Sequence, residues 1–364
     1  MPPEAQPGGF SAHSARLARI LALAYLLVVV YASVQPFHGW RTPPPDIAEF
    51  LLAPWPRYIT TEDIVVNLAA YVPLGFFLSI GWGANLGAGR GVLAATACAI
   101  AVSLLIETTQ MFLPARIASN VDLLTNGVGA LIGAMAAPLF APTRILGGKI
   151  HALRRRLFHD GMAADVGLVI VCLWPATQFH PTAQLFGAGA VRLGFQMPGY
   201  LSYTPALALG GEAAVAFLNV LGIGLLVSVL LREGERRMPL VGLVVGAAVI
   251  AKALSAAALH KVGAPLAWLT PGITIGLLAA WAMLYGVTRL PRATQLALGS
   301  ICVLLAAVAI NLAPDNPYHS VAPRLIAGGQ SHFLNFSGIV RAISDLWPLL
   351  AFAFLGYELA SRRE

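Results

Sequence analysis

The chain has 364 residues, of which 58% are hydrophobic and 11% are charged, and its mean hydropathy is +0.75. Soluble domains normally have about a quarter of their residues charged, so this composition excludes an ordinary soluble protein and indicates a polytopic membrane protein. The net charge of +7 arises from short basic clusters between apolar runs. Such clusters are typical of loops that orient a membrane protein, so no nucleic acid is expected as a partner.

The N-terminal region is predicted to contain a tail, a first membrane span and a loop. Residues 1–15 are rich in Pro, Gly and Ala and are expected to be disordered. The run Leu17–Val34 is long enough to span and lacks a small-residue cleavage site at its end, so we expect a retained helix rather than a signal peptide. The Pro-rich segment Gln35–Thr61, with Trp40 and Trp55, is typical of a loop at the lipid headgroup level.

Further apolar runs follow, each close to the ~20 residues that a helix needs to cross a bilayer. The sequence therefore predicts an all-α polytopic transmembrane helix bundle with about ten spans. These further runs lie at residues 63–82, 91–113, 122–142, 163–178, 212–231, 239–259, 265–287, 294–312 and 341–360.

The loops between these runs alternate in basic content. The clusters Arg144–Arg156 and Arg232–Arg237 fall on the same side of the predicted membrane as Arg16 and Arg19, whereas the long loops on the other side are poor in Lys and Arg. Basic loops stay on the cytoplasmic side. We therefore expect a multi-pass protein of the bacterial inner membrane with both termini in the cytoplasm.

The two halves of the chain also resemble each other weakly. Glu212–Leu231 aligns with Asp63–Trp82, and Lys252–Gly272 aligns with Glu107–Gly127. This pattern predicts a degenerate internal repeat of a four-helix module, and the shared composition of membrane helices is the alternative explanation. The predicted organisation is a tail at 1–15, a first four-helix module at 16–142, a basic cytoplasmic loop at 143–162, a second module at 163–290 and a helix pair at 291–364.

Polar residues that a bilayer normally excludes are concentrated in the first module. They form pairs spaced three or four residues apart, which places the members of each pair on one helix face. The predicted topology brings these pairs to one depth, near the outer ends of their helices. Ionisable groups in spanning segments are costly and mark functional sites by default. The candidate ligand-binding residues are Asp63, Asn67, Glu107, Gln110, Arg116, Asp122 and Asn126.

These residues also have a purely structural interpretation. Asp63 and Asp122 stand near predicted helix N-termini, where carboxylates cap the first turn. The amide side chains are of a kind that hydrogen-bonds across membrane helices. Glu107 is the hardest to explain in this way, because a carboxylate at that depth needs a partner, and Arg116 is the nearest candidate by sequence.

Proline and glycine residues in the same helices complete the pattern. Gly129 and Gly133 are typical of a close-packing helix face, and Pro73 with Gly75 is typical of a kink. The whole ordered set resembles the VanZ-like family of bacterial membrane proteins. The resemblance implies a four-helix membrane module associated with low-level resistance to glycopeptide antibiotics, above all teicoplanin. Typical members are a single such module, so the helices that follow it here are an extension. The residues that carry the resemblance are Asp63, Asn67, Pro73-x-Gly75, Glu107-x-x-Gln110, Arg116, Asp122-x-x-x-Asn126, Gly129 and Gly133.

Three function classes are consistent with these residues. We favour a binding or transport-like module whose outward pocket engages a polar envelope ligand, such as a lipid-linked precursor or a glycopeptide, with Arg116 on a phosphate or carboxylate. A structural scaffold comes second. An intramembrane enzyme comes last, with Glu107 as a general base or with Asp63, Glu107 and Asp122 holding a hard divalent cation. No nucleophile supports it, because Thr108, Thr109 and Ser119 have no His or Cys at a suitable spacing. Membrane lipid is an expected partner, and neither a cofactor nor a metal ion is expected.

Overall fold

The computed structural model describes residues 10–34, 39–43, 45–46, 48–55, 59, 61–114, 116–179, 184–194, 200–259, 268–314 and 331–361. Apart from an isolated antiparallel bridge between Phe158 and Leu231, these residues form helices and their connections. The helices are α1 (Ala12–Val34), α2 (Glu49–Leu52), α3 (Thr61–Leu86), α4 (Ala88–Gln110), α5 (Asn120–Ala136), the 3₁₀ helix η1 (Ala137–Phe140), α6 (Ile145–Leu157), α7 (Met162–Thr177), α8 (Val191–Gly194), α9 (Pro205–Leu230), α10 (Arg237–Leu259), α11 (Pro271–Val287), α12 (Arg292–Leu312) and α14 (Ser331–Ala360).

The predicted all-α polytopic bundle is confirmed. Within the described residues, 8 helices are long and apolar enough to cross a membrane, and two shorter apolar helices, α7 and α11, coincide with the remaining predicted runs. Whether these two also cross stays a prediction. The segment predicted as a basic loop at 143–162 contains the helix α6, whose polar side is rich in arginine.

The chain divides into two compact units. Unit 1 comprises Met1–Arg154 and Gly329–Ile339, and unit 2 comprises Arg155–Gly328 and Val340–Glu364. Most of the predicted tail, residues 1–9, lies outside the described part of the chain. The candidate site residues all belong to unit 1.

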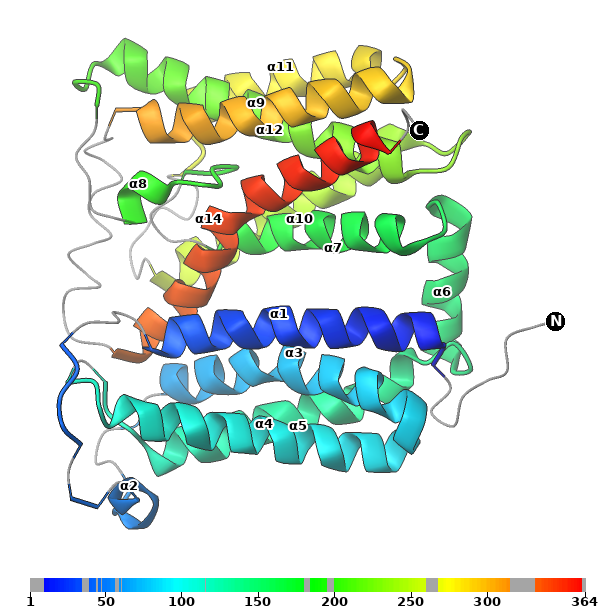
Figure 1. Cartoon of the computed structure of the whole chain (residues 1–364). Coiled ribbons are helices and arrows are strands. Elements are labelled where there is room, and N and C mark those ends of the chain that lie inside the picture. Colours follow the sequence, from blue (N-terminus) through cyan, green and yellow to red (C-terminus); the bar gives the residue numbers. More distant parts are fainter. Residues whose placement is uncertain are drawn as a thin grey trace. The chain divides into compact units, whose positions relative to one another are not determined.

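In unit 1, the helices α1, α3, α4 and α5 lie side by side (Figure 1). The closest approach is between α3 and α5, where glycines let the two backbones touch. A Cβ added at Gly129 would lie 2.2 Å from the carbonyl oxygen of Leu68, and one at Gly133 would lie 1.9 Å from that of Val72. The prediction that Gly129 and Gly133 form a close-packing face is therefore confirmed.

Hydrogen bonds between helices add to this packing. The Tyr25 hydroxyl on α1 donates to the Ala70 carbonyl on α3 at 2.8 Å, and Arg19 Nε donates to the Gly81 carbonyl at 2.9 Å. Ser79 Oγ on α3 donates to the Ala134 carbonyl on α5 at 3.0 Å. In an apolar environment such bonds fix the relative register of helices, because an unpaired donor there is costly.

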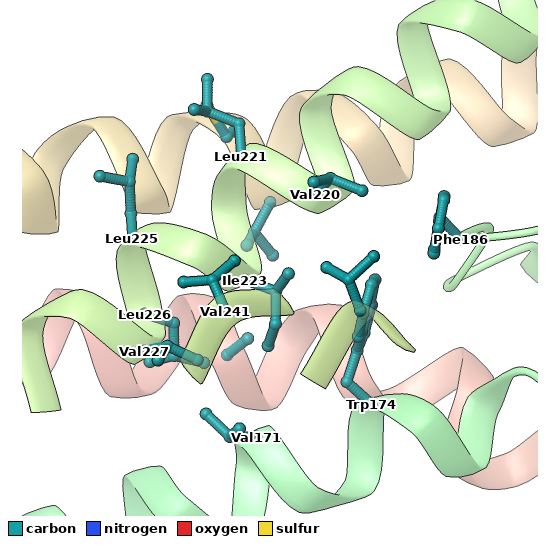
Figure 2. Packing of buried hydrophobic residues seen from close by; sticks show 14 of the residues in the cluster. Val171, Trp174, Phe186, Val220, Leu221, Ile223, Leu225, Leu226, Val227 and Val241 are labelled. Atoms are coloured by element: carbon teal, nitrogen blue, oxygen red, sulfur yellow. The ribbon is translucent and has the colours of Figure 1, made fainter. Parts of the chain in front are cut away.

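Unit 2 has an apolar core centred on α9, which is buried on most of its circumference (Figure 2). Trp174 on α7 stacks on Phe186 with ring centroids 5.5 Å apart, and its neighbour Trp347 donates from Nε1 to the Ile170 carbonyl at 2.8 Å. The packing of α11 on α9 again uses glycines, since a Cβ at Gly276 would lie 2.3 Å from the Ala213 carbonyl oxygen.

Candidate functional site

A cavity lies at one end of unit 1, among the C-terminal ends of α1 and α4 and the N-terminal ends of α3 and α5. This is the left-hand end of these helices in Figure 1. The volume of the cavity that the centre of a water-sized guest can occupy is about 20 Å³. This is enough for one such guest and too little for a whole lipid headgroup. The polar residues that line it are Asn67, Tyr71, Glu107, Gln110, Asp122 and Asn126.

Glu107 and Gln110 come from the last turn of α4, and both are already anchored on one side. Glu107 is 3% exposed, and its Oε2 accepts a hydrogen bond of 2.9 Å from the backbone N–H of Ser119. The Nε2 of Gln110 donates to the carbonyl oxygen of Ser33 at the end of α1, at 3.1 Å. These bonds leave Glu107 Oε1 and the Gln110 amide oxygen as the further polar atoms of the two side chains.

Asn126 and Asn67 supply polar atoms that have no hydrogen-bond partner among the described residues. Asn126 is 5% exposed, and its Nδ2 donates to Ser103 Oγ at 2.9 Å while its Oδ1 is buried and unpaired. Asn67 is 7% exposed, and its Nδ2 is likewise unpaired. Buried polar groups in folded proteins are nearly always hydrogen-bonded. The hydroxyl of Tyr71 is a third unpaired buried group on the same cavity. Three exceptions on one cavity indicate a place where a guest is held.

Asp122 reaches the cavity from the first turn of α5. The N-terminal cap of this helix is Ser119, whose Oγ accepts from the backbone N–H groups of Val121 at 3.2 Å and Asp122 at 3.4 Å. Asp122 follows this cap by three residues and lines the cavity. Its carboxylate is close enough to Glu107 to act on it electrostatically.

Arg116 is buried beside the cavity, outside the set of residues that line it. Its guanidinium donates to the carbonyl oxygen of Ala32 at 2.9 Å. Burial lowers the pKa of Arg116, and the nearby Glu107 carboxylate opposes this shift. Arginine stays charged even after a large shift, so Arg116 is a fixed positive charge next to Glu107.

The structure thus brings together most of the candidate residues predicted from the sequence. Asn67, Glu107, Gln110, Asp122 and Asn126 share one cavity, whereas Asp63 and Arg116 do not line it. Sequence reasoning missed Tyr71, a buried residue of the lining. Its position four residues after Asn67, on the same helix face, is the signal that would have found it.

The hydroxyl groups near Glu107 have structural partners. Thr108 Oγ1 donates to the Leu104 carbonyl at 2.8 Å and Thr109 Oγ1 to the Leu105 carbonyl at 2.7 Å, both within α4. The Ser119 hydroxyl caps α5. In the described part of the chain, no three His, Cys, Asp or Glu side chains gather in a metal-binding group.

The comparisons with known proteins cover this same region. The family model described as VanZ/LLP1 matches residues 17–141, a range that includes every candidate site residue. The comparisons with curated proteins and with solved structures gave no match. Residues 17–141 therefore form a VanZ-like module in the N-terminal region of a longer membrane protein.

Proposed function

We propose that the VanZ-like module is a binding module of the bacterial cell envelope that holds one polar group of a ligand in the cavity of unit 1. The observation that carries this proposal is a set of three unpartnered buried atoms on a cavity with room for a guest, namely Asn67 Nδ2, Tyr71 Oη and Asn126 Oδ1. A polar cluster that served only to lock helices together would pair these atoms internally, because leaving each one unpaired costs about 1–3 kcal/mol.

The side of the membrane follows from the charge of the loops. With the basic clusters in the cytoplasm, α1 starts at the inner face of the membrane and ends at the outer face. The cavity lies at the C-terminal end of α1. It would therefore open toward the envelope side, where lipid-linked wall precursors and glycopeptide antibiotics are found.

The size of the cavity limits what enters it. One functional group fits, and the remainder of a lipid-linked precursor or of teicoplanin would stay outside, against α2 and the neighbouring loop. Exposed aromatic and apolar residues there, Trp40, Leu52 and Trp55, are suited to the headgroup region. Resistance to teicoplanin would result from this binding. An enzyme is less favoured, because the hydroxyl groups of Thr108 and Thr109 are engaged with their own helix.

The test compares susceptibility with abundance in a teicoplanin-sensitive bacterium. We expect the wild-type protein to raise the minimal inhibitory concentration of teicoplanin, and Glu107→Gln and Asn126→Leu to abolish that increase. Glu233→Gln is the matched control, because this carboxylate is exposed, lies outside the VanZ-like module and does not line the cavity. Immunoblots of the membrane fraction show whether each variant is present in the normal amount.

A loss of resistance at normal abundance in the cavity variants alone supports the proposal. If both cavity variants instead lose abundance in parallel with resistance, the polar cluster is structural and the binding proposal is wrong. The same conclusion follows if thermal shift of the purified protein finds no ligand among lipid-linked precursors and teicoplanin.

A further inference from the structure

The helix α6 differs in character from the apolar helices around it. It has 13 residues, fewer than the ~20 that a helix needs to cross a bilayer. Its sequence contains Lys149 and the run Arg154–Arg156 and has neither Asp nor Glu. A helix this short and this basic does not span the membrane, yet it also exposes large apolar side chains.

These apolar side chains form a stripe along one face of α6. Leu146, Ile150 and Leu153 follow one another at spacings of four and three residues, which places them on the same side of a helix. They are 47%, 43% and 55% exposed. Leu157 continues the stripe by one more turn and packs against the apolar core of unit 2. The stripe therefore faces the layer that holds the apolar helices, and most of its length is uncovered by protein.

Both ends of α6 are held at the ends of helices that are long enough to span. At its start, a Cβ added at Gly147 would lie 2.1 Å from the carbonyl oxygen of Ala141, which directly follows η1 at the end of the span formed with α5. At its end, the backbone N–H of Arg232, just past α9, donates to the Leu157 carbonyl at 2.9 Å. In Figure 1, α6 runs across the direction of α3 and α5. A helix held in this way lies along the membrane surface.

The basic residues border the apolar stripe. The helical period places Lys149 and Arg156 along one edge of the stripe and Arg154 along the other, with Arg155 on the opposite face. Long basic side chains at such edges lay their methylene groups over apolar surface and extend their charges to the headgroup level. Positive charge at this level is attracted to anionic lipid headgroups.

We propose that α6 is an interfacial helix that binds anionic phospholipids of the cytoplasmic leaflet. The stripe of Leu146, Ile150 and Leu153 inserts at the boundary of the acyl chains, and the basic residues at its edges bind lipid phosphates. The charge of the helix and its place at the ends of the spans favour a lipid surface over a protein partner. The inference is independent of the proposed function, because no residue of α6 lines the cavity of unit 1.

The experiment places a fluorescent probe on each side of α6 in the full-length protein. In a background with Cys98, Cys172 and Cys302 replaced by alanine, an environment-sensitive fluorophore is attached to Ile150→Cys on the stripe or to Ala152→Cys on the polar side. Both positions are exposed. Each protein is reconstituted in nanodiscs of phosphatidylcholine, with or without phosphatidylglycerol. Quenching by a nitroxide-labelled lipid reports contact of the probe with the bilayer.

We expect the probe at Ile150→Cys to be shifted to the blue and quenched, and the probe at Ala152→Cys to remain in water. Quenching at Ile150→Cys should be about twofold stronger with phosphatidylglycerol than without it, and high salt should reduce this difference because it screens exposed charges. Adding Lys149→Gln and Arg156→Gln should abolish the difference. Both side chains are exposed, so these substitutions should leave the fold intact, which gel filtration checks.

Three results would overturn the inference. If both probes remain in water in every nanodisc, α6 does not enter the bilayer surface. If quenching at Ile150→Cys is equal with and without phosphatidylglycerol, the helix does not recognise anionic lipid. If this probe is already shielded in detergent, to an extent that rises with protein concentration, a second copy of the chain covers the stripe. Each of these results leaves the proposed binding function of the cavity unaffected.

Discussion

Ser119 links the start of α5 to the buried end of α4 through two different groups. Its hydroxyl accepts from the first N–H groups of α5, and its own N–H donates to Glu107 Oε2. Ser119 thus caps the first turn of α5 and also anchors the buried carboxylate of Glu107. Sequence reasoning noted Ser119 only as a weak candidate nucleophile, because a cap and a nucleophile have the same side chain.

Replacing the cap should weaken α5 without removing the anchor of Glu107. We expect Ser119→Ala to lower the free energy of unfolding by about 1 kcal/mol, the usual cost of a lost N-cap. Ser119→Thr keeps the hydroxyl and should stay close to wild type. Thermal unfolding of the purified variants measures the difference. Equal stability of the two variants would show that the hydroxyl does not stabilise the helix.

The charge of Arg116 can be tested through its coupling to Glu107. Arg116→Met removes both the bond to the Ala32 carbonyl and the positive charge next to a buried carboxylate, so we expect a loss of about 3 kcal/mol or more. Adding Glu107→Gln removes the uncompensated charge and should restore part of that loss. A double-mutant cycle on unfolding temperatures measures the coupling. If the two losses are simply additive, Arg116 does not balance Glu107.

At the scale of helices, close glycine contacts recur in both units. In unit 1, Gly129 and Gly133 of α5 meet the carbonyl groups of Leu68 and Val72 on α3. In unit 2, Gly272 and Gly276 of α11 meet those of Leu209 and Ala213 on α9. Both cases place two glycines, four residues apart, on two carbonyls four residues apart. The two glycine pairs do not coincide in the alignment of the two halves, which sets Gly272 on Gly127, so the internal repeat stays a prediction.

A pair of identical substitutions in α3 tests these backbone contacts. A Cβ at Gly75 would lie 2.0 Å from the Ala130 carbonyl oxygen, whereas one at Gly83 meets nothing within 4 Å. We expect Gly75→Ala to destabilise the protein by about 1–3 kcal/mol through overpacking. Gly83→Ala should be neutral or stabilising by up to about 1 kcal/mol, because alanine favours helix. Similar unfolding temperatures for the two variants would contradict the close contact.

The elements were predictable to a large extent and the site only in part. Apolar runs near the length of a bilayer predict helices directly, so the long apolar helices coincide with them, whereas α6 lies in a segment that was predicted as a loop. The spacing of Glu107 with Gln110 and of Asp122 with Asn126 placed each pair on one face, and the cavity lies there. The roles of Asp63 and Arg116 depend on how loops and helix ends pack, which one sequence does not specify.

At the scale of the whole molecule, the orientation in the membrane decides which solvent the cavity meets. The basic residues of α6 and of the connection between α9 and α10 should lie in the cytoplasm, and the segment before α9 should lie outside. The described helices are compatible with this arrangement by their length and composition. The orientation is therefore a prediction that can be measured directly.

Cysteine accessibility in intact cells provides that measurement. Lys149 in α6 and Tyr200 before α9 are both exposed, so Lys149→Cys and Tyr200→Cys should fold normally. In a background with Cys98, Cys172 and Cys302 replaced by alanine, an impermeant maleimide should label Tyr200→Cys and leave Lys149→Cys unlabelled until the cells are lysed. The reverse pattern would place the termini, and the cavity, on the other sides of the membrane.

The contact between α3 and α5 also sets the kinetics of access to the cavity. Two helices whose backbones touch have no side chains that can rearrange between them, so they are expected to move as one body. The opposite wall is joined by hydrogen bonds from Gln110 to the Ser33 carbonyl and from Arg116 to the Ala32 carbonyl. A guest that left the cavity between α1 and α4 would have to break these bonds. The residence time of a bound guest should therefore depend on Gln110 and Arg116, even though only one of them faces the guest.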